Sequence, residues 1–298
     1  MKTKPYLPLI AAACFALGST QAQQPYTADG NTMLLYHFDQ NSGATAAPDS
    51  SGNGRNATYG SGTTSGLTSA TGLDRAFSGT DTNTGRVFYT DPTTPGTDSF
   101  LYDMVNNDFT VEMWVKFDDV TFSTGGNRRL FAIQPTGSTD VDLQLSIINY
   151  SNATYGGALS LGNTGALNRT FTTTPYNWVA DEWYHIAIAV TTTGGTNTAN
   201  FYINQAGDSA TPTPWATTTF GSLTPSSSTS TRTISFGNMY GNNGDSYFPG
   251  VIDEVRVSNI ARTEFQTLIP EPSVAALSLT ALAGFLFRKK WKRSYLTK

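Results

Sequence analysis

Hydrophobic and polar residues alternate along short segments of this chain, with a period of two. The clearest case is Phe109–Phe117, where every odd-numbered position is apolar and the even-numbered positions carry Thr, Glu, Trp and Lys. A period of two with one apolar face is typical of a half-buried antiparallel strand. Tyr184–Thr191 has the same period, but its second face is small and nearly apolar. We therefore expect this second segment to be a central strand.

Ten alternating segments are separated by breaks rich in Gly, Ser, Thr and Asn, and helical periodicity is scarce. Such strands with turn signals between them predict one large β-sandwich. Short helices are expected at Tyr102–Asn106 and Arg262–Leu268, and loops at the Ser/Thr-rich stretches Thr191–Thr198 and Thr217–Thr233. The predicted strands are Met33–Asp39, Arg86–Tyr89, Phe109–Phe117, Arg129–Ile133, Leu143–Ile148, Ala158–Leu161, Tyr184–Thr191, Ala199–Ile203, Thr233–Gly237 and Phe248–Ser258.

Residues 1–22 have the order of a secretory signal peptide. Lys2 and Lys4 precede the apolar run Leu7–Leu17, and residues 20–22 supply small residues for a cleavage site. A positive segment, an apolar core and a small-residue site are typical of export. One alternative, a buried N-terminal helix, would need an amphipathic periodicity that this run lacks. The other, a lipoprotein acceptor at Cys14, is disfavoured because the apolar run continues past the cysteine.

The C-terminal residues form a second pattern of three parts. Pro270-Glu271-Pro272 is followed by the apolar stretch Val274–Phe287 and then by a basic cluster, Arg288–Arg293. This order resembles the PEP-CTERM sorting signal. The resemblance implies transient inner-membrane association, recognition and cleavage by an exosortase-type enzyme, and release to the cell surface or its polysaccharide matrix. A plain C-terminal membrane anchor is the alternative, although the stretch is shorter than the about 20 residues of a spanning helix.

The charges are divided unevenly along the chain. The whole chain has 18 Lys+Arg and 22 Asp+Glu, a net charge of −4. Eight basic residues lie in the two ends, whereas every acidic residue lies between Ala22 and Pro272, so the middle carries a net charge of −12. An acidic middle argues against nucleic acid and anionic membranes as partners. The only cysteine, Cys14, lies in the predicted signal peptide, so we expect no disulfide in the mature chain.

Five segments resemble, in order, the laminin-G-like jelly-roll family. They are Leu34–Asp39, Asp49–Gly54, Phe109–Lys116, Glu182–Ala187 and Phe248–Val257. The resemblance implies an all-β, concanavalin A-like jelly-roll sandwich of two antiparallel sheets, with the first and last strands side by side. It also implies calcium binding, glycan or protein recognition, and adhesion. We therefore expect a signal peptide at 1–22, a jelly-roll domain at 23–268 and a sorting signal at 269–298.

Asp253 is the strongest indication of a metal. The alternation through Phe248–Ser258 puts Asp253 on the same face as Val255 and Val257. A carboxylate is costly to bury on an apolar face unless it is paired or bound to a metal. The alternative without an ion is that Arg256 or backbone donors hold the carboxylate.

The expected metal is one structural Ca²⁺, because calcium accepts carboxylate and backbone carbonyl ligands in irregular geometry. The expected companions of Asp253 are Asp39, at the end of the first strand, with Asp49 and the backbone of Gly52 in a nearby turn. Their meeting depends on the adjacency of the first and last strands that the resemblance implies.

Four tyrosines lie in segments flanked by Asn and Gly and would be suited to stack on sugar rings: Tyr150, Tyr155, Tyr240 and Tyr247. The alternative is that they cover the edges of the core. The acidic middle is compatible with neutral glycans. These residues predict a carbohydrate ligand without naming it.

No catalytic motif is evident. Retaining glucanases need two carboxyl groups about 5–5.5 Å apart, and no glutamate lies in the pattern that usually presents them. Asp140 and Asp142 come nearest, and His37 and His185 lie in predicted strands without a nucleophile elbow.

We therefore expect a non-catalytic protein exported by a Gram-negative-type bacterium to its surface or extracellular matrix. Its jelly-roll domain is expected to bind carbohydrate or protein ligands in exopolysaccharide-associated adhesion. The alternatives are a glycan-active enzyme of the glucanase or lyase type and a purely structural matrix component.

Overall fold

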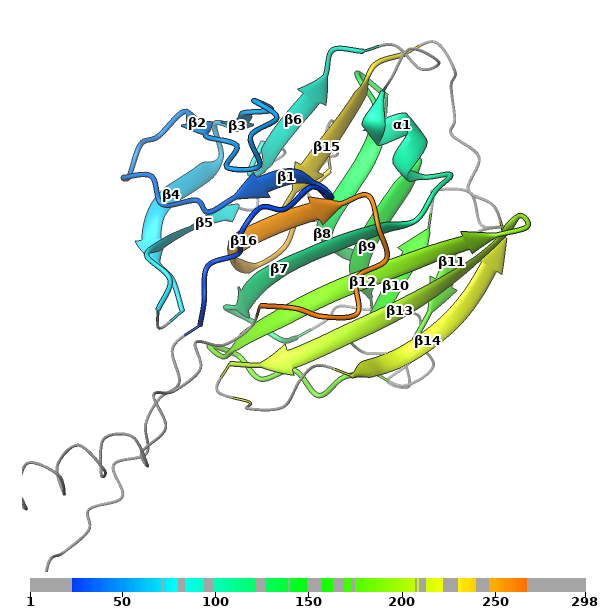
Figure 1. Cartoon of the computed structure of the whole chain (residues 1–298). Helices are drawn as coiled ribbons and strands as arrows, with labels where there is room; N and C mark the ends of the chain where they lie inside the picture. The colour runs from blue at the N-terminus through cyan, green and yellow to red at the C-terminus, as the bar shows by residue number, and fades with distance from the viewer. Residues whose placement is uncertain are drawn as a thin grey trace, which may run out of the picture.

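Two antiparallel sheets packed against each other make up the structure (Figure 1). This confirms the predicted all-β sandwich. The computed structural model describes residues 23–70, 72–79, 84–93, 99–121, 127–138, 140–148, 157–162, 169–172, 175–206, 208, 213–221, 230–239 and 247–266.

The first sheet, sheet A, contains the first and the last strand of the described chain. Its strands are β1 (Thr32–Tyr36), β4 (Thr63–Thr68), β5 (Arg75–Gly79), β7 (Phe109–Phe117), β12 (Trp183–Thr193), β13 (Thr196–Gln205), β14 (Pro214–Gly221) and β16 (Gly250–Ser258). Their order is β14-β13-β12-β7-β16-β5-β4. β5 pairs with the start of β16, and β1 pairs antiparallel with its second half. The expected adjacency of the first and last strands is confirmed.

The second sheet, sheet B, closes the core from the other side. Its strands are β2 (Ala46–Ala47), β3 (Ala57–Tyr59), β6 (Val87–Asp91), β8 (Asn127–Pro135), β9 (Leu143–Ile148), β10 (Ala158–Gly162), β11 (Arg169–Phe171) and β15 (Arg232–Phe236). Their order is β11-β10-β9-β8-β15-β6-β3-β2. One short helix, α1 (Phe100–Met104), connects β6 to β7.

The core lies between the sheets and follows the alternation of the sequence. The odd-numbered residues of β7 pack in it, and so do Tyr184, Ile186, Ile188 and Val190 of β12. Ala187 and Ala189 face outward from β12, where Phe265 packs against them. β12 lies between β7 and β13, as its two apolar faces predict.

Each of the ten predicted strands corresponds to an observed strand, and α1 begins two residues before the predicted helix. Three expectations are wrong in whole or in part. Thr217–Thr233 is not entirely a loop, because Thr217–Gly221 belongs to β14 and pairs with β13. Thr191–Thr198 is not a loop but the hairpin of β12 and β13, which turns at Gly194 and Gly195. Residues 262–266 are not helical. They lie on sheet A, where the Arg262 backbone N–H donates to Thr110 Oγ1 at 2.8 Å.

A β-bulge in β16 overturns the predicted face of Asp253. The register against β7 shifts between Asp253 and Arg256, so that two residues of β16 lie opposite one of β7. Beyond the bulge the alternation is reversed. Val255 and Val257 face the core, whereas Asp253 pairs with Trp114 on the outer face.

Glu254 occupies the bulge with a positive φ of 49°. Such a conformation is strained for a residue with a side chain. Both carboxylate oxygens are engaged. Oε1 lies 2.7 Å from His37 Nδ1, and Oε2 accepts the Tyr26 N–H at 2.8 Å. These contacts hold the strained residue in place and attach the N-terminal segment to β16.

The outer face of sheet A is buried beneath both ends of the described chain. Tyr26 packs there with Leu35 and Trp114, and the Thr27 N–H donates to Gln266 Oε1 at 2.9 Å. Arg262 Nη2 lies 2.7 Å from Asp29 Oδ1. Figure 1 shows the N-terminal segment in blue and the C-terminal segment in orange on the same sheet.

The predicted signal peptide and the predicted sorting signal lie outside the described residues. Within the part of the chain that the structure describes, no helix is long and apolar enough to cross a membrane.

Replacing Glu112 with Gln should destabilise the fold strongly. The Glu112 carboxylate is fully buried between Arg256 Nε, at 2.7 Å, and His185 Nε2, at 3.2 Å. Without it the guanidinium is left buried and unpaired, which costs about 3–5 kcal/mol. Urea unfolding of the full chain measures this loss. Glu182→Gln, at an exposed position, is the control and should change stability by less than about 0.5 kcal/mol. If Glu112→Gln lost no more stability than the control variant, the structural role given to the Glu112–Arg256 ion pair would be contradicted.

Candidate functional site

The residues predicted to bind calcium fall into two groups. Asp253 is fully buried. Its carboxylate accepts from Ser69 Oγ and from the Glu254 N–H. Asp39 is exposed and close enough to Asp253 to raise its pKa. Asp253 and Asp39 therefore lie within electrostatic range of each other.

Asp49 has a different role. Its carboxylate accepts hydrogen bonds from the backbone N–H groups of Leu35, Ser51 and Arg55 at 2.9–3.0 Å and from Ser51 Oγ at 2.8 Å. These bonds fix the turn that also contains Gly52, with φ of 87°. Because the Asp49 carboxylate already accepts four hydrogen bonds from the protein, it is poorly suited to bind a metal.

No group of three or more His, Cys, Asp or Glu side chains suited to a metal occurs within the described ranges. Asp253, Asp39 and Asp49 are therefore not gathered into one such group. Calcium binding stays a prediction of the sequence.

The electrostatics around Asp253 are instead those of a buried carboxyl beside another acid. Burial raises the pKa of Asp253 well above its usual range, and the charge of Glu254 raises it further. His37 is affected in two opposing ways. Burial lowers its pKa, but the hydrogen bond and the charge of Glu254 outweigh burial, so the pKa of His37 is raised above 6.5.

The remaining residues singled out from the sequence, the tyrosines predicted to stack on sugars, the sorting motif and the Asp140/Asp142 pair, do not form one site among the described residues. Tyr247 is half-buried, and the Arg128 guanidinium lies 5.5 Å from its ring centroid. Tyr150, Tyr155 and Tyr240 lie outside the described residues, as do Pro270, Glu271, Pro272 and Arg288 of the sorting motif. Asp142 is buried with its Oδ2 atom 2.6 Å from Arg232 Nε, whereas Asp140 is exposed. The structure therefore gives Asp142 a structural ion pair.

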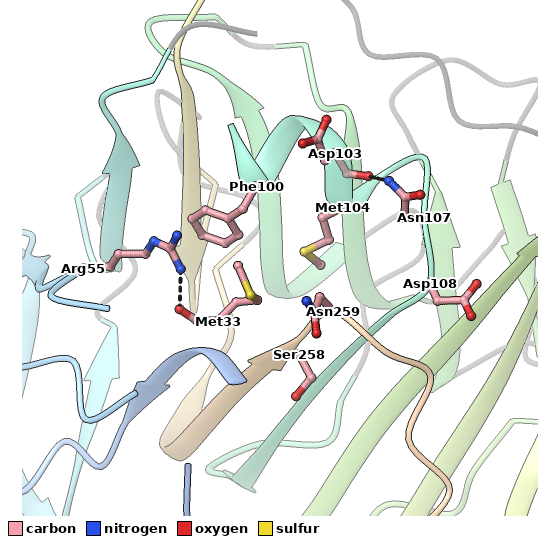
Figure 2. Close-up of a pocket in the computed structure, with 9 residues that line it drawn as sticks. All are labelled: Met33, Arg55, Phe100, Asp103, Met104, Asn107, Asp108, Ser258 and Asn259. Carbon is pink, nitrogen blue, oxygen red and sulfur yellow. Dashed lines mark hydrogen bonds between the residues drawn. The ribbon is translucent and has the colours of Figure 1, made fainter. Parts of the chain in front are cut away.

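A pocket of about 430 Å³ lies where α1, the end of β16 and the start of β1 meet (Figure 2). This volume is within the range of about 300–1,000 Å³ that is usual for small-molecule sites. We call it the α1 pocket. Its lining residues are Met33, Arg55, Phe100, Asp103, Met104, Asn107, Asp108, Ser258 and Asn259.

The helix is positioned by its N-cap. Ser99 Oγ accepts the Tyr102 N–H and donates to Asp91 Oδ2 at 3.0 Å, which ties the helix start to the end of β6. Leu101 and Met104 face inward from α1. Phe100 lies on the side toward Arg55, where Figure 2 shows it between the arginine and Met104.

Arg55 and Phe100 contact each other at the pocket. The Arg55 guanidinium lies 4.1 Å from the Phe100 ring centroid, a cation–π contact. Arg55 Nη1 donates to the Met33 carbonyl oxygen at 2.9 Å. An oriented guanidinium beside an aromatic ring offers both donors and an apolar surface to a ligand.

Amides and carboxylates surround this centre. Asn107 Nδ2 donates to the Asp103 carbonyl oxygen at 2.8 Å, which leaves its Oδ1 as an acceptor. Asp108 Oδ1 accepts the Thr192 N–H at 2.7 Å. Asn107, Asp103, Asp108 and Asn259 are all exposed. The pocket therefore has an apolar centre and a polar rim, as small-molecule sites commonly do.

Sequence reasoning missed the α1 pocket. Its residues come from four separate stretches of the chain, and none of them forms a motif. The only available signal was the pair of carboxamides at Asn106 and Asn107 next to Asp108. Such a run is more often a helix end than a binding site.

Residues 90–266 match the family model described as the concanavalin A-like lectin/glucanases superfamily. The match covers more than half of the chain. A search of curated proteins gave no match.

Solved structures with a similar fold include a sialidase. A Trypanosoma rangeli sialidase in complex with sialic acid is 11% identical with a TM-score of 0.51, and the match covers 80% of this chain and 32% of the sialidase. A botulinum neurotoxin type C structure is 13% identical with a TM-score of 0.46, covering 78% of this chain and 49% of that one. The LG1-3 region of the laminin alpha2 chain is 14% identical with a TM-score of 0.33, covering 60% and 31%.

The chain spans about a third of the length of the sialidases it matches. At this identity the likeness concerns the fold. It nevertheless corrects the expectation of a non-enzyme, since the same fold occurs within an enzyme that acts on glycans. The missing glucanase carboxylate pattern therefore does not separate this chain from glycan-active proteins, and the sequence-based interpretation is wrong.

The pair of His37 and Glu254 should make stability depend on pH. Since the pKa of His37 is raised above 6.5 in the folded chain, its contribution is fully present below that value. It is lost as pH rises through the folded pKa, because the folded state binds more protons there. We expect His37→Gln to cost more stability at about pH 5.5 than at about pH 9. Urea unfolding midpoints of the wild type and of His37→Gln at the two pH values measure this difference. A loss of stability that is the same at both pH values would contradict the prediction. Asp253 also has a raised pKa, but it is present in the wild type and in the variant, so its contribution to the pH dependence cancels in the comparison.

Proposed function

Because the chain belongs to the concanavalin A-like lectin/glucanases superfamily, we propose that it is an exported protein that binds carbohydrate in its α1 pocket. The observation that carries this proposal is the combination of an arginine-stacked aromatic ring with amide and carboxylate groups in one pocket of suitable size. Sugars need both kinds of group, since their hydroxyls hydrogen-bond to planar polar side chains and their C–H faces pack on apolar surface.

The arrangement of the pocket supports a small ligand. Phe100 and Met33 are half-buried, so part of each is accessible while the remainder is fixed by packing. Ser258 is buried and accepts from Arg262 Nε at 2.7 Å, which gives the pocket a rigid wall. Such preorganisation lowers the entropic cost of binding.

The proposed location is the cell surface or extracellular matrix. The sequence at the two ends supports it: a signal-peptide order at residues 1–22 and, at 269–298, the motif, apolar stretch and basic cluster of a sorting signal. The proposed partners are an exosortase-type enzyme during export and extracellular polysaccharide afterwards. The net charge of −12 in the middle of the chain suits a neutral polysaccharide better than an anionic one.

Asn107→Ala should weaken carbohydrate binding by about tenfold, the effect of losing about one hydrogen bond to a ligand. Asn106→Ala is a matched control, because both side chains are exposed and donate to the carbonyl four residues earlier. Only Asn107 lines the pocket. A glycan array followed by calorimetry on the full chain measures binding, with product analysis to record any cleavage. Equal effects of the two variants would contradict the site, and no binding to any glycan would contradict the function.

Surface protein purified from the native host should have lost both ends of the chain. Intact-mass measurement should give an N-terminus near residue 23 and a C-terminus near Pro270 to Pro272. A chain that still ends at Lys298 would contradict the sorting step and support a plain membrane anchor instead.

A further inference from the structure

The centre of the α1 pocket is apolar although its rim is polar. Met33, Met104 and Phe100 converge there in Figure 2, and Met104 is only 6% exposed. A sugar hydroxyl pressed against these groups would lose its hydrogen bonds to water without gaining others. A methyl group, in contrast, is stabilised by burial against thioethers and a phenyl ring. The centre therefore suits a sugar with an apolar substituent.

The groups next to this centre match an amide. Arg55 donates to the Met33 carbonyl and its side chain also hydrogen-bonds to Tyr89. A guanidinium has five donors, so donors remain for a ligand carbonyl. Asn107 Oδ1 is an acceptor suited to a ligand N–H, since its Nδ2 is used for the Asp103 carbonyl. The amide of Asn259, which lies below Met104 in Figure 2, offers both a donor and an acceptor to ring hydroxyls.

The charges at the rim disfavour an anionic sugar. Asp103 and Asp108 are both exposed carboxylates at the pocket, against the single guanidinium of Arg55. One face of that guanidinium is covered by Phe100. A ligand carboxylate or sulfate would meet two like charges, which repel it. A neutral substituent avoids this repulsion.

From these contacts we propose that the α1 pocket selects neutral sugars that carry an acetamido group. The methyl lies between Met33 and Met104, the carbonyl accepts from Arg55, and the N–H donates to Asn107. The proposal rests on the proposed function, because it names the ligand class of the same pocket.

A matched pair of disaccharides tests this preference. N,N′-diacetylchitobiose and cellobiose share the same ring and linkage and differ in the acetamido group that replaces the hydroxyl at C2. We expect the full chain to bind the acetylated sugar at least about tenfold more tightly, about 1.4 kcal/mol. The unacetylated amine of the same disaccharide, measured at about pH 9 where it is uncharged and the rim carboxylates do not attract it, should bind no better than cellobiose. Calorimetry measures all three.

The outcomes separate the two proposals. Equal binding of the acetylated sugar and cellobiose overturns the acetamido preference and leaves carbohydrate binding in place. Binding of other glycans but of neither disaccharide also overturns the preference. Binding of no glycan overturns the proposed function itself.

Two substitutions at Met33 locate the preference in the pocket. Met33→Gln keeps the length of the side chain but places an amide in the apolar centre, so the preference should fall to less than about threefold. Met33→Leu keeps the apolar character and should retain most of it. Melting temperatures of both variants show that they fold. A full preference in Met33→Gln would overturn the proposed position of the methyl group.

Discussion

The buried carboxylate of Glu112 is the interaction on which the outer half of this molecule depends. It extends from the central strand β7 and binds Arg256 of β16 on one side and His185 of β12 on the other. Arg256 in turn donates to the Thr27 carbonyl oxygen at 3.0 Å and lies 4.9 Å from the Tyr26 ring. One acid therefore links three neighbouring strands to the N-terminal segment. A buried ion pair of this kind does little for stability by itself, but the loss of Glu112 leaves the Arg256 guanidinium buried without an opposite charge.

This arrangement explains which parts of the fold the sequence could predict. Strands with a clear alternation, such as β7 and β9, were predicted to the residue because one face meets the core. The bulge at Glu254 was not predictable. Its signal is a positive φ at a non-glycine residue, held by contacts with Tyr26 and His37 from far along the chain. The same bulge invalidated the predicted face of Asp253, since one inserted residue exchanges the two faces beyond it.

The candidate site was harder to predict, for a different reason. Predictions from sequence concentrate on residue types with strong chemistry, and here those residues are largely structural. Asp49 organises a turn, Asp142 pairs with Arg232, and Asp253 is covered by Ser69. The α1 pocket is made of ordinary residues that the topology brings together. Met33 and Asn259 become neighbours because β1 and β16 pair antiparallel. The adjacency of these strands was expected, but the register that brings the two residues together is visible only in the fold.

The course of residues 259–266 has a mechanical consequence. Asn259 lines the α1 pocket, and the segment that follows runs along sheet A to Gln266. When a ligand holds the pocket and the chain is pulled beyond Gln266, the tension passes through this one segment. The contacts that resist it include the Ile260 carbonyl with Thr110, the side chain of Arg262 with Asp29, and Gln266 with Thr27. The load then enters the sandwich through β16 and its pairing with β1. A tethered molecule is therefore expected to yield first at the segment, which lies outside the strand ladders, while the paired strands remain folded.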